Sequence, residues 1–104
     1  MNIHEFGLDK EKTIVLIHPS LVMWDYFEYV RPLLKDKYHV IIPALPGYDE
    51  EKPNENFTSV EEIADSLSRW LTEHKIKTID LLYGCSMGGS IALKILSNQQ
   101  VEIK

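Results

Sequence analysis

The residues best suited to chemistry lie at positions 84–88, which read Gly-Cys-Ser-Met-Gly. A serine hydroxyl becomes a useful nucleophile when a sharp turn between a strand and a helix lifts it clear of the sheet. Glycines on either side, here Gly84 and Gly88, remove the side chains that would collide across such a turn. A buried-type apolar run at 78–83 precedes the pattern, and an apolar helix follows it. Ser86 is therefore predicted to be a nucleophile.

The backbone around this serine would also stabilise the charge that a reaction develops. The helix predicted at 90–96 directs its positive N-terminal end at Ser86. The backbone N–H of Met87 is placed there to donate to a developing oxyanion. The turn would therefore place a nucleophile beside a donor to a developing oxyanion.

Two other functions of glycine-rich loops, and one structural role, compete with this interpretation. Gly84 and Gly89 have the spacing of a phosphate-binding loop, but Ser90 and Ile91 stand where that loop needs Lys and Ser or Thr. A dinucleotide-binding loop needs glycine where Ser86 stands. A serine can also cap a helix without doing any chemistry. The strand before the pattern and the helix after it favour the nucleophile.

The elements that must position these residues alternate along the chain. Three short apolar runs are typical of strands buried on both faces, at 13–18, 39–42 and 78–83. Three segments have the apolar spacing of helices, at 24–36, 58–74 and 90–96. This order predicts an α/β fold, a parallel sheet of about three strands with helices on both faces. The residues before Thr13 are expected to add a short extra strand.

The second of these helices has the clearest signals. Thr58 followed by Glu61 is the pattern of a capping box at its start. One apolar face runs along it, formed by Val60, Ile63, Leu67, Trp70, Leu71 and His74. In the first helix, Pro32 is expected to cause a kink or to displace the helix start. Residues 44–57, rich in Pro, Gly, Asn and charge, are predicted to form a surface loop.

Three polar or glycine-containing segments directly follow the predicted strands. They are 18–20 (His-Pro-Ser), Pro46-Gly47 and the turn with Ser86. In an open parallel sheet the reactive groups gather at the carboxyl ends of the strands. The three segments are therefore predicted to share one edge of the sheet.

These segments together resemble the α/β-hydrolase superfamily, over about 14–97. The residues 18–20 are similar to the family's His-Gly-x oxyanion loop, and 43–48 (Pro-Ala-Leu-Pro-Gly-Tyr) to its Asp-Leu-Pro-Gly-x-Gly loop. The resemblance implies that the three strands lie side by side, with strand 78–83 next to strand 13–18.

The resemblance also implies a second oxyanion donor, the backbone N–H of Ser20, beside that of Met87. The sequence departs from the family pattern in these loops. Pro19 stands at a usual glycine and removes one backbone donor. Ala44 replaces the usual aspartate, and Asp49 stands at a usual glycine.

Three further side chains lie near the predicted site. Trp24 and Tyr48 fall in loops at the same edge of the sheet, where they would line a substrate pocket or pack against the fold. Cys85 adjoins the serine but is expected to point into the core as a small apolar group.

A serine nucleophile needs a general base, and this sequence has no histidine to serve as one after the serine, where the family has one. The family places its catalytic acid and histidine after the serine, and no histidine follows Ser86 here. The upstream histidines are expected to be structural or solvated: His4, His18, His39 and His74. Residues 1–104 are therefore expected to form a partial domain. In complete form it would be a serine hydrolase acting on an ester, thioester or similar carbonyl substrate.

A non-catalytic half-domain is the alternative function. In the family fold the far side of strand 78–83 pairs with a next strand, which this sequence is expected to lack. The open apolar edge would then pair with a second copy or with a complementary chain.

Composition excludes several other classes. The formal net charge of −5 and the absence of a basic run argue against nucleic acid and anionic membrane surfaces as partners. No apolar run approaches the roughly 20 residues of a membrane helix. A single cysteine and a polar N-terminus favour a cytoplasmic protein. The sequence predicts neither a cofactor nor a metal site.

Overall fold

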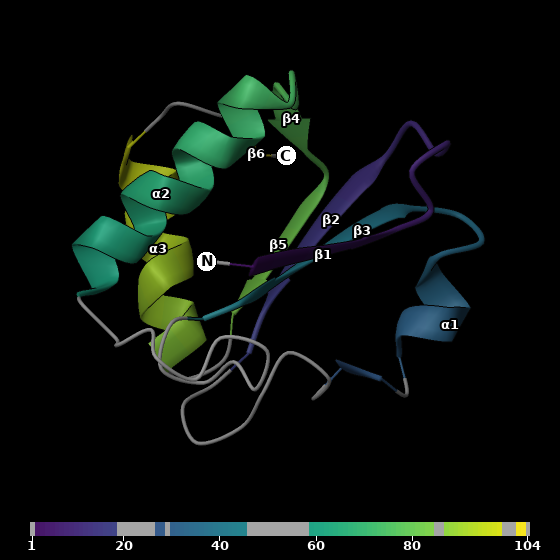
Figure 1. The fold of residues 1–104 in the computed structure, drawn as a ribbon, viewed down its shortest axis with the longest axis horizontal. Coiled ribbons are helices and arrows are strands. Elements are labelled where there is room, and N and C mark those ends of the chain that lie inside the picture. The colour runs from purple at the N-terminus through teal and green to yellow at the C-terminus, as the bar shows by residue number, and fades with distance from the viewer. Residues whose placement is uncertain are drawn as a thin grey trace.

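The computed structural model describes residues 2–18, 27–28, 30–45, 59–84, 87–98 and 102–103. Figure 1 shows a twisted sheet with helices α2 and α3 together on one side and α1 on the other. As far as these residues go, no helix is long and apolar enough to cross a membrane.

The main sheet has four strands in the order β1-β3-β2-β5. They are β1 (Asn2–Phe6), β2 (Thr13–Ile17), β3 (His39–Ala44) and β5 (Leu81–Gly84). Strand β2 pairs in parallel with both β3 and β5, whereas β1 is antiparallel to β3. The predicted parallel arrangement of these three strands and their adjacency are confirmed. The segment before Thr13 supplies the expected extra strand as β1.

Both faces of the two inner strands are covered, because β2 and β3 are buried at every position. Alternate residues of a strand point to opposite faces, so the continuous apolar runs divide into two clusters. One cluster includes Val15, Ile17 and Ile41 and packs against helices α2 (Val60–Glu73) and α3 (Met87–Asn98).

The opposite face of the sheet holds the second cluster. It contains Ile14, Leu16, Val40 and Ile42. Phe27, and Leu34 from helix α1 (Arg31–Leu34), pack there. Helices on both faces of the sheet, as predicted, therefore exclude water from β2 and β3.

The continuous strand predicted at 78–83 is wrong, because the chain bends at Asp80. Two short strands, β4 (Thr78–Ile79) and β5, lie on either side of the bend. Asp80 pairs with Thr13 twice: its backbone N–H donates to the Thr13 carbonyl oxygen at 2.8 Å, and its carboxylate Oδ2 accepts from the Thr13 N–H at 2.8 Å. The Asp80 side chain thus takes the place of a backbone carbonyl as the acceptor of the Thr13 N–H, at the point where the chain bends.

The expectation that nothing pairs with the far side of residues 78–83 is wrong for β4. Strand β6 (Glu102–Ile103) runs parallel to β4, with Thr78 opposite Glu102 and Ile79 opposite Ile103. For β5, the only strand neighbour among the described residues is β2. The open edge is therefore shorter than predicted.

The helix boundaries also differ from the predictions. Within the described residues the first helix is confined to Arg31–Leu34, after a helical turn at Phe27. Its proline is the second residue, in the first turn, where no backbone N–H is needed. The third helix extends to Met87–Asn98.

Helix α2 starts at Val60, so the cap predicted at Thr58 is wrong. The cap is Ser59, whose Oγ accepts from the Glu62 N–H at 3.1 Å. The predicted apolar face is largely confirmed: Ile63, Leu67 and Leu71 are fully or almost fully buried and Val60 and Trp70 partly, while His74 is exposed.

Candidate active site

The carboxyl ends of β2, β3 and β5 lie at one edge of the sheet, as predicted. In the parallel pairing of β2 with β5, Ile17 is opposite Gly84. His18 follows β2, and Leu45 follows β3. The loops after these strands therefore start side by side.

Several predicted site residues lie outside the described part of the chain, namely Ser20, Trp24, Tyr48, Cys85 and Ser86. The structure does describe Gly84, Gly88 and the backbone of Met87, where α3 begins. It therefore gives the two sides of the turn that carries Ser86.

The two glycines are sites of close backbone approach. A Cβ added at Gly84 would overlap the carbonyl group of Gly88 and lie 2.8 Å from the Gly89 nitrogen. One added at Gly88 would lie 2.8 Å from the His18 carbonyl oxygen and closer still to that of Ile17. Real Cβ atoms essentially never come that near to backbone atoms. Only glycine fits, so α3 starts tightly against the ends of both β5 and β2.

His18 is a structural histidine, as expected. It is fully buried, and its Nε2 accepts a hydrogen bond from the Leu45 backbone N–H at 3.1 Å. This bond ties the end of β2 to the end of β3. The nitrogen is thereby occupied and is not free to take a proton from a serine.

His39 and His74 lie at the opposite, amino-terminal end of the parallel strands. His39 begins β3, and its Nε2 is 2.8 Å from the Glu5 carboxylate. His74 follows α2, where its Nδ1 lies 2.8 Å from the Trp70 carbonyl oxygen and its ring stacks on Trp70 with centroids 4.0 Å apart. Neither reaches the carboxyl edge.

His4 lies on β1, three strands across the sheet from β5. At about 4.8 Å per strand, that spacing amounts to roughly 14 Å. None of the four histidines is therefore placed to act as a base toward the turn at residues 84–88.

Within the described ranges, neither a shifted pKa nor a cluster of metal-binding side chains indicates a second functional site. The pKa of the Asp9 carboxyl is lowered, chiefly by its hydrogen bond from the Lys10 ammonium at 3.0 Å. That pair is exposed in the turn after β1, away from the carboxyl edge. Across the described residues, no three His, Cys, Asp or Glu side chains gather as metal ligands would.

Sequence reasoning missed two features, one at the site and one at the opposite, amino-terminal end of β5. The approach of Gly88 to Ile17 and His18 joins the turn to β2, whereas the pattern predicted only a clash within the turn. The bonding of Asp80 to Thr13 fixes the register of β5 beside β2. The only indication of this bond in the sequence was that Asp80 is a lone carboxylate in an otherwise apolar strand.

The sequence model of a family described as "Alpha/beta hydrolase family" matches residues 14–101 of this chain. A curated relative, the uncharacterized hydrolase YNR064C of Saccharomyces cerevisiae, is 30% identical over 97 residues. The match takes in 89% of this chain and 33% of the relative. The chain thus spans about a third of the length of the curated relative.

Solved structures share the fold. A Desulfitobacterium hafniense protein, described as of the alpha/beta hydrolase family, is 30% identical with a TM-score of 0.91. The match covers 98% of this chain and 41% of that protein. A serine hydrolase from Cycloclasticus zankles is 25% identical with a TM-score of 0.76, over 98% of this chain and 38% of its own.

Proposed function

The chain belongs to the alpha/beta hydrolase family, and we propose that it is the nucleophile-bearing part of a serine hydrolase. In this proposal Ser86 attacks an ester, thioester or similar carbonyl substrate. The observation that carries it is the packing of Gly84 and Gly88, which leaves room for no side chain on either side of the turn. The similarity to the Cycloclasticus serine hydrolase supports it.

The proposed reaction follows from the residues around the turn. The Oγ of Ser86 bonds to the carbonyl carbon while its proton passes to a general base. The negative charge on the carbonyl oxygen is stabilised by the backbone N–H groups of Met87 and Ser20 and by the N-terminal end of α3. The bond to the leaving group then breaks as that group takes up the proton, and water releases the acyl group with return of the serine proton.

The relatives contain a region that this chain does not span. We propose that polypeptide equivalent to that region supplies the general base. This follows from the positions of the histidines. His18 is held by Leu45, and His39 and His74 lie at the wrong end of the strands. An unassisted serine is a weak nucleophile, so Ser86 alone would give only residual reactivity.

A chimera tests this proposal, with residues 1–104 replacing the equivalent region of the Desulfitobacterium hafniense protein. We expect a fluorophosphonate probe to label the chimera roughly 10³-fold or more faster than the isolated chain, since the chimera restores the base. Ser86→Ala should abolish labelling. Cys85→Ala, the matched control at the neighbouring position, should leave most of it. Fast labelling of the Ser86→Ala variant would show that Ser86 is not the nucleophile.

A further inference from the structure

An aromatic contact joins strand β5 to the chain between β2 and α1. The rings of Phe27 and Tyr83 lie edge to face, with centroids 5.9 Å apart and planes inclined at 85°. Phe27 is buried and belongs to the apolar cluster that also contains Leu16. Aromatic rings favour this arrangement because the positive edge of one ring meets the negative face of the other. The contact is therefore directional, and an aliphatic side chain would not reproduce it.

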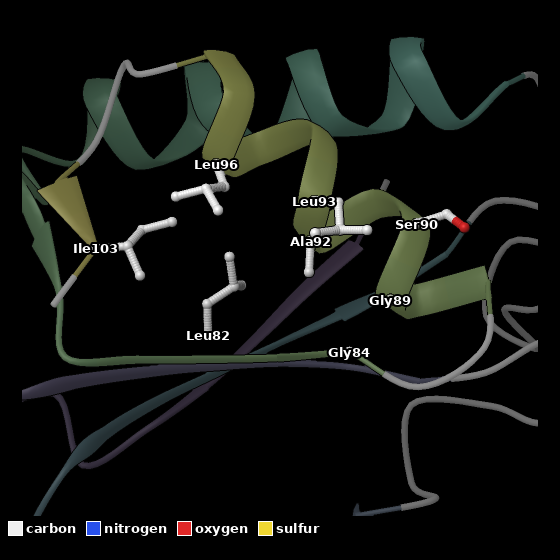
Figure 2. A pocket seen from close by; sticks show the side chains of 8 residues that line it. All are labelled: Leu82, Gly84, Gly89, Ser90, Ala92, Leu93, Leu96 and Ile103. Atoms are coloured by element: carbon white, nitrogen blue, oxygen red, sulfur yellow. The ribbon is translucent and has the colours of Figure 1, made fainter.

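The contact lies directly beside the turn of the proposed nucleophile. Tyr83 immediately precedes Gly84, which is opposite Ile17 in the pairing of β5 with β2. Figure 2 shows Leu82 on the side of β5 that faces helix α3, with Gly84 at the end of the strand. Since successive side chains of a strand alternate, Tyr83 lies on the opposite face, where Phe27 packs. Tyr83 thus provides the last side chain of β5 before the turn.

The residues on either side of segment 19–26 are both anchored to the sheet. The segment contains Ser20, whose backbone N–H is the second proposed oxyanion donor, and it lies outside the described residues. At its start, His18 is held by the hydrogen bond to its Nε2. At its end, Phe27 is buried against Tyr83. Fixing both ends of a segment reduces the number of conformations that its backbone can adopt.

An oxyanion hole requires that its donors converge on one oxygen atom. Each N–H must lie about 2.7–3.1 Å from the position that the oxyanion takes. One proposed donor, Met87, begins helix α3 after the turn, whereas the other, Ser20, belongs to a different segment. Their separation depends on the contacts that join these two parts of the chain. The approach of Gly88 to the end of β2 is one such contact, and the pair of Phe27 and Tyr83 is another.

We propose that Tyr83 and Phe27 are positioning residues, which set the separation of the two oxyanion donors by holding the end of segment 19–26 against β5. Neither ring touches the reacting atoms. Tyr83 acts through Phe27 and the backbone that leads back to Ser20. The inference rests on the function proposed above, because it assigns the pair a role in that reaction. The pair should contribute to kcat more than to KM, since the oxyanion is absent from the bound substrate.

Packing of the apolar cluster is the alternative role of this contact, and a second residue of the cluster separates the two roles. Leu34 of helix α1 packs against the same cluster as Phe27. Removing its side chain measures what a loss of packing does by itself. Leu34→Ala should therefore lower the melting temperature and leave kcat unchanged at temperatures where the variant is folded.

Steady-state kinetics of the Desulfitobacterium chimera, with p-nitrophenyl acetate as substrate, test the inference. Tyr83→Leu removes the ring and should lower kcat by about 10–100-fold with little change in KM, because a misplaced donor weakens only the stabilisation of the oxyanion. Tyr83→Phe keeps the ring and should retain most of kcat. Phe27→Leu should lower kcat as Tyr83→Leu does, and the double variant should be no worse than either, because each substitution breaks the same contact.

Failure of this inference and failure of the proposed function give different results. An unchanged kcat in Tyr83→Leu, a rise in KM alone, or an equal loss of kcat in Leu34→Ala would overturn the positioning role, while Ser86→Ala still abolished activity. An equal loss in Tyr83→Phe would assign the effect to the hydroxyl group and overturn it too. Activity that survives Ser86→Ala would overturn the proposed function, and this inference with it.

Nuclear magnetic resonance of the 104-residue chain provides a test that does not depend on the chimera. Nuclear Overhauser effects are expected between the ring protons of Phe27 and Tyr83, because the two rings are in contact. They should persist in Leu34→Ala and disappear in Phe27→Leu. If the unsubstituted chain showed no such effects, the contact itself would be absent and the inference would be wrong.

Discussion

The backbone N–H of Leu45 donates to Nε2 of His18 at 3.1 Å, and both residues are fully buried. For Nε2 to accept, the imidazole must be neutral with its proton on Nδ1. The bond links the first residue after β2 to the first residue after β3, so it fixes how the two loops leave the sheet. His18 therefore positions the backbone of Leu45, and its Nε2 is unavailable for proton transfer.

Replacing His18 should separate the hydrogen bond from the packing of the ring. His18→Leu leaves the Leu45 N–H buried without this acceptor and should lower the free energy of unfolding by about 1–3 kcal/mol. His18→Gln retains an acceptor oxygen and should cost less. Urea-induced unfolding of both variants measures the difference. Equal losses would mean that ring packing, and not the hydrogen bond, stabilises this corner.

Two adjacent glycines of α3 should respond differently to alanine. A Cβ at Gly88 would press on the carbonyl oxygens of Ile17 and His18, so Gly88→Ala should cost about 2 kcal/mol or more. A Cβ added at Gly89 would have the Gly84 carbonyl oxygen as its nearest neighbour, at 3.3 Å. There the gain in helix propensity, about 1 kcal/mol, should offset the tight contact. Thermal unfolding of the pair provides the measurement, and a Gly88→Ala variant as stable as Gly89→Ala would contradict the close approach.

The carboxylate of Asp80 should matter through its acceptor oxygen more than through its charge. Asp80→Ala removes the acceptor of the Thr13 N–H, which belongs to a buried residue, and should cost about 1–3 kcal/mol. Asp80→Asn keeps an acceptor and should retain most of the stability. Chemical unfolding at neutral pH measures both variants. If asparagine were as harmful as alanine, the negative charge itself would be required.

The start of α2 offers a direct check of where the helix is capped. Ser59→Ala should lower stability by about 1 kcal/mol, because the Glu62 N–H loses its acceptor. Ser59→Asp should preserve it. The capping-box pattern would place this loss at Thr58→Ala instead, so comparing the alanine variants by thermal unfolding distinguishes the two positions.

The parallel core was predictable because it depends on local pattern. Continuous apolar runs predicted that β2 and β3 are strands buried on both faces. The glycines on either side of Ser86 predicted a tight turn before a helix. Alternation of strands and helices then fixed the parallel order. The family resemblance placed β5 beside β2, and the register of Ile17 with Gly84 agrees with it.

The features that sequence reasoning missed depend on partners far along the chain or on very short segments. The bend at Asp80 is set by Thr13, 67 residues away. Strand β6 has two residues, too few for any periodicity. The roles proposed for Ser86, Ser20, Trp24 and Tyr48 stay predictions, because these residues lie outside the described part of the chain.

The central position of β2 has a consequence for how the protein forms during synthesis. Its pairing with β3 closes a loop of modest length, so β1, β2 and β3 can associate once residue 44 has left the ribosome. Its pairing with β5 must wait until residues 81–84 and the whole of α2 have been made. Contacts so distant in sequence form slowly. In that interval the nascent chain presents the bare apolar border of β2, and this is the stage at which it should depend most on chaperones.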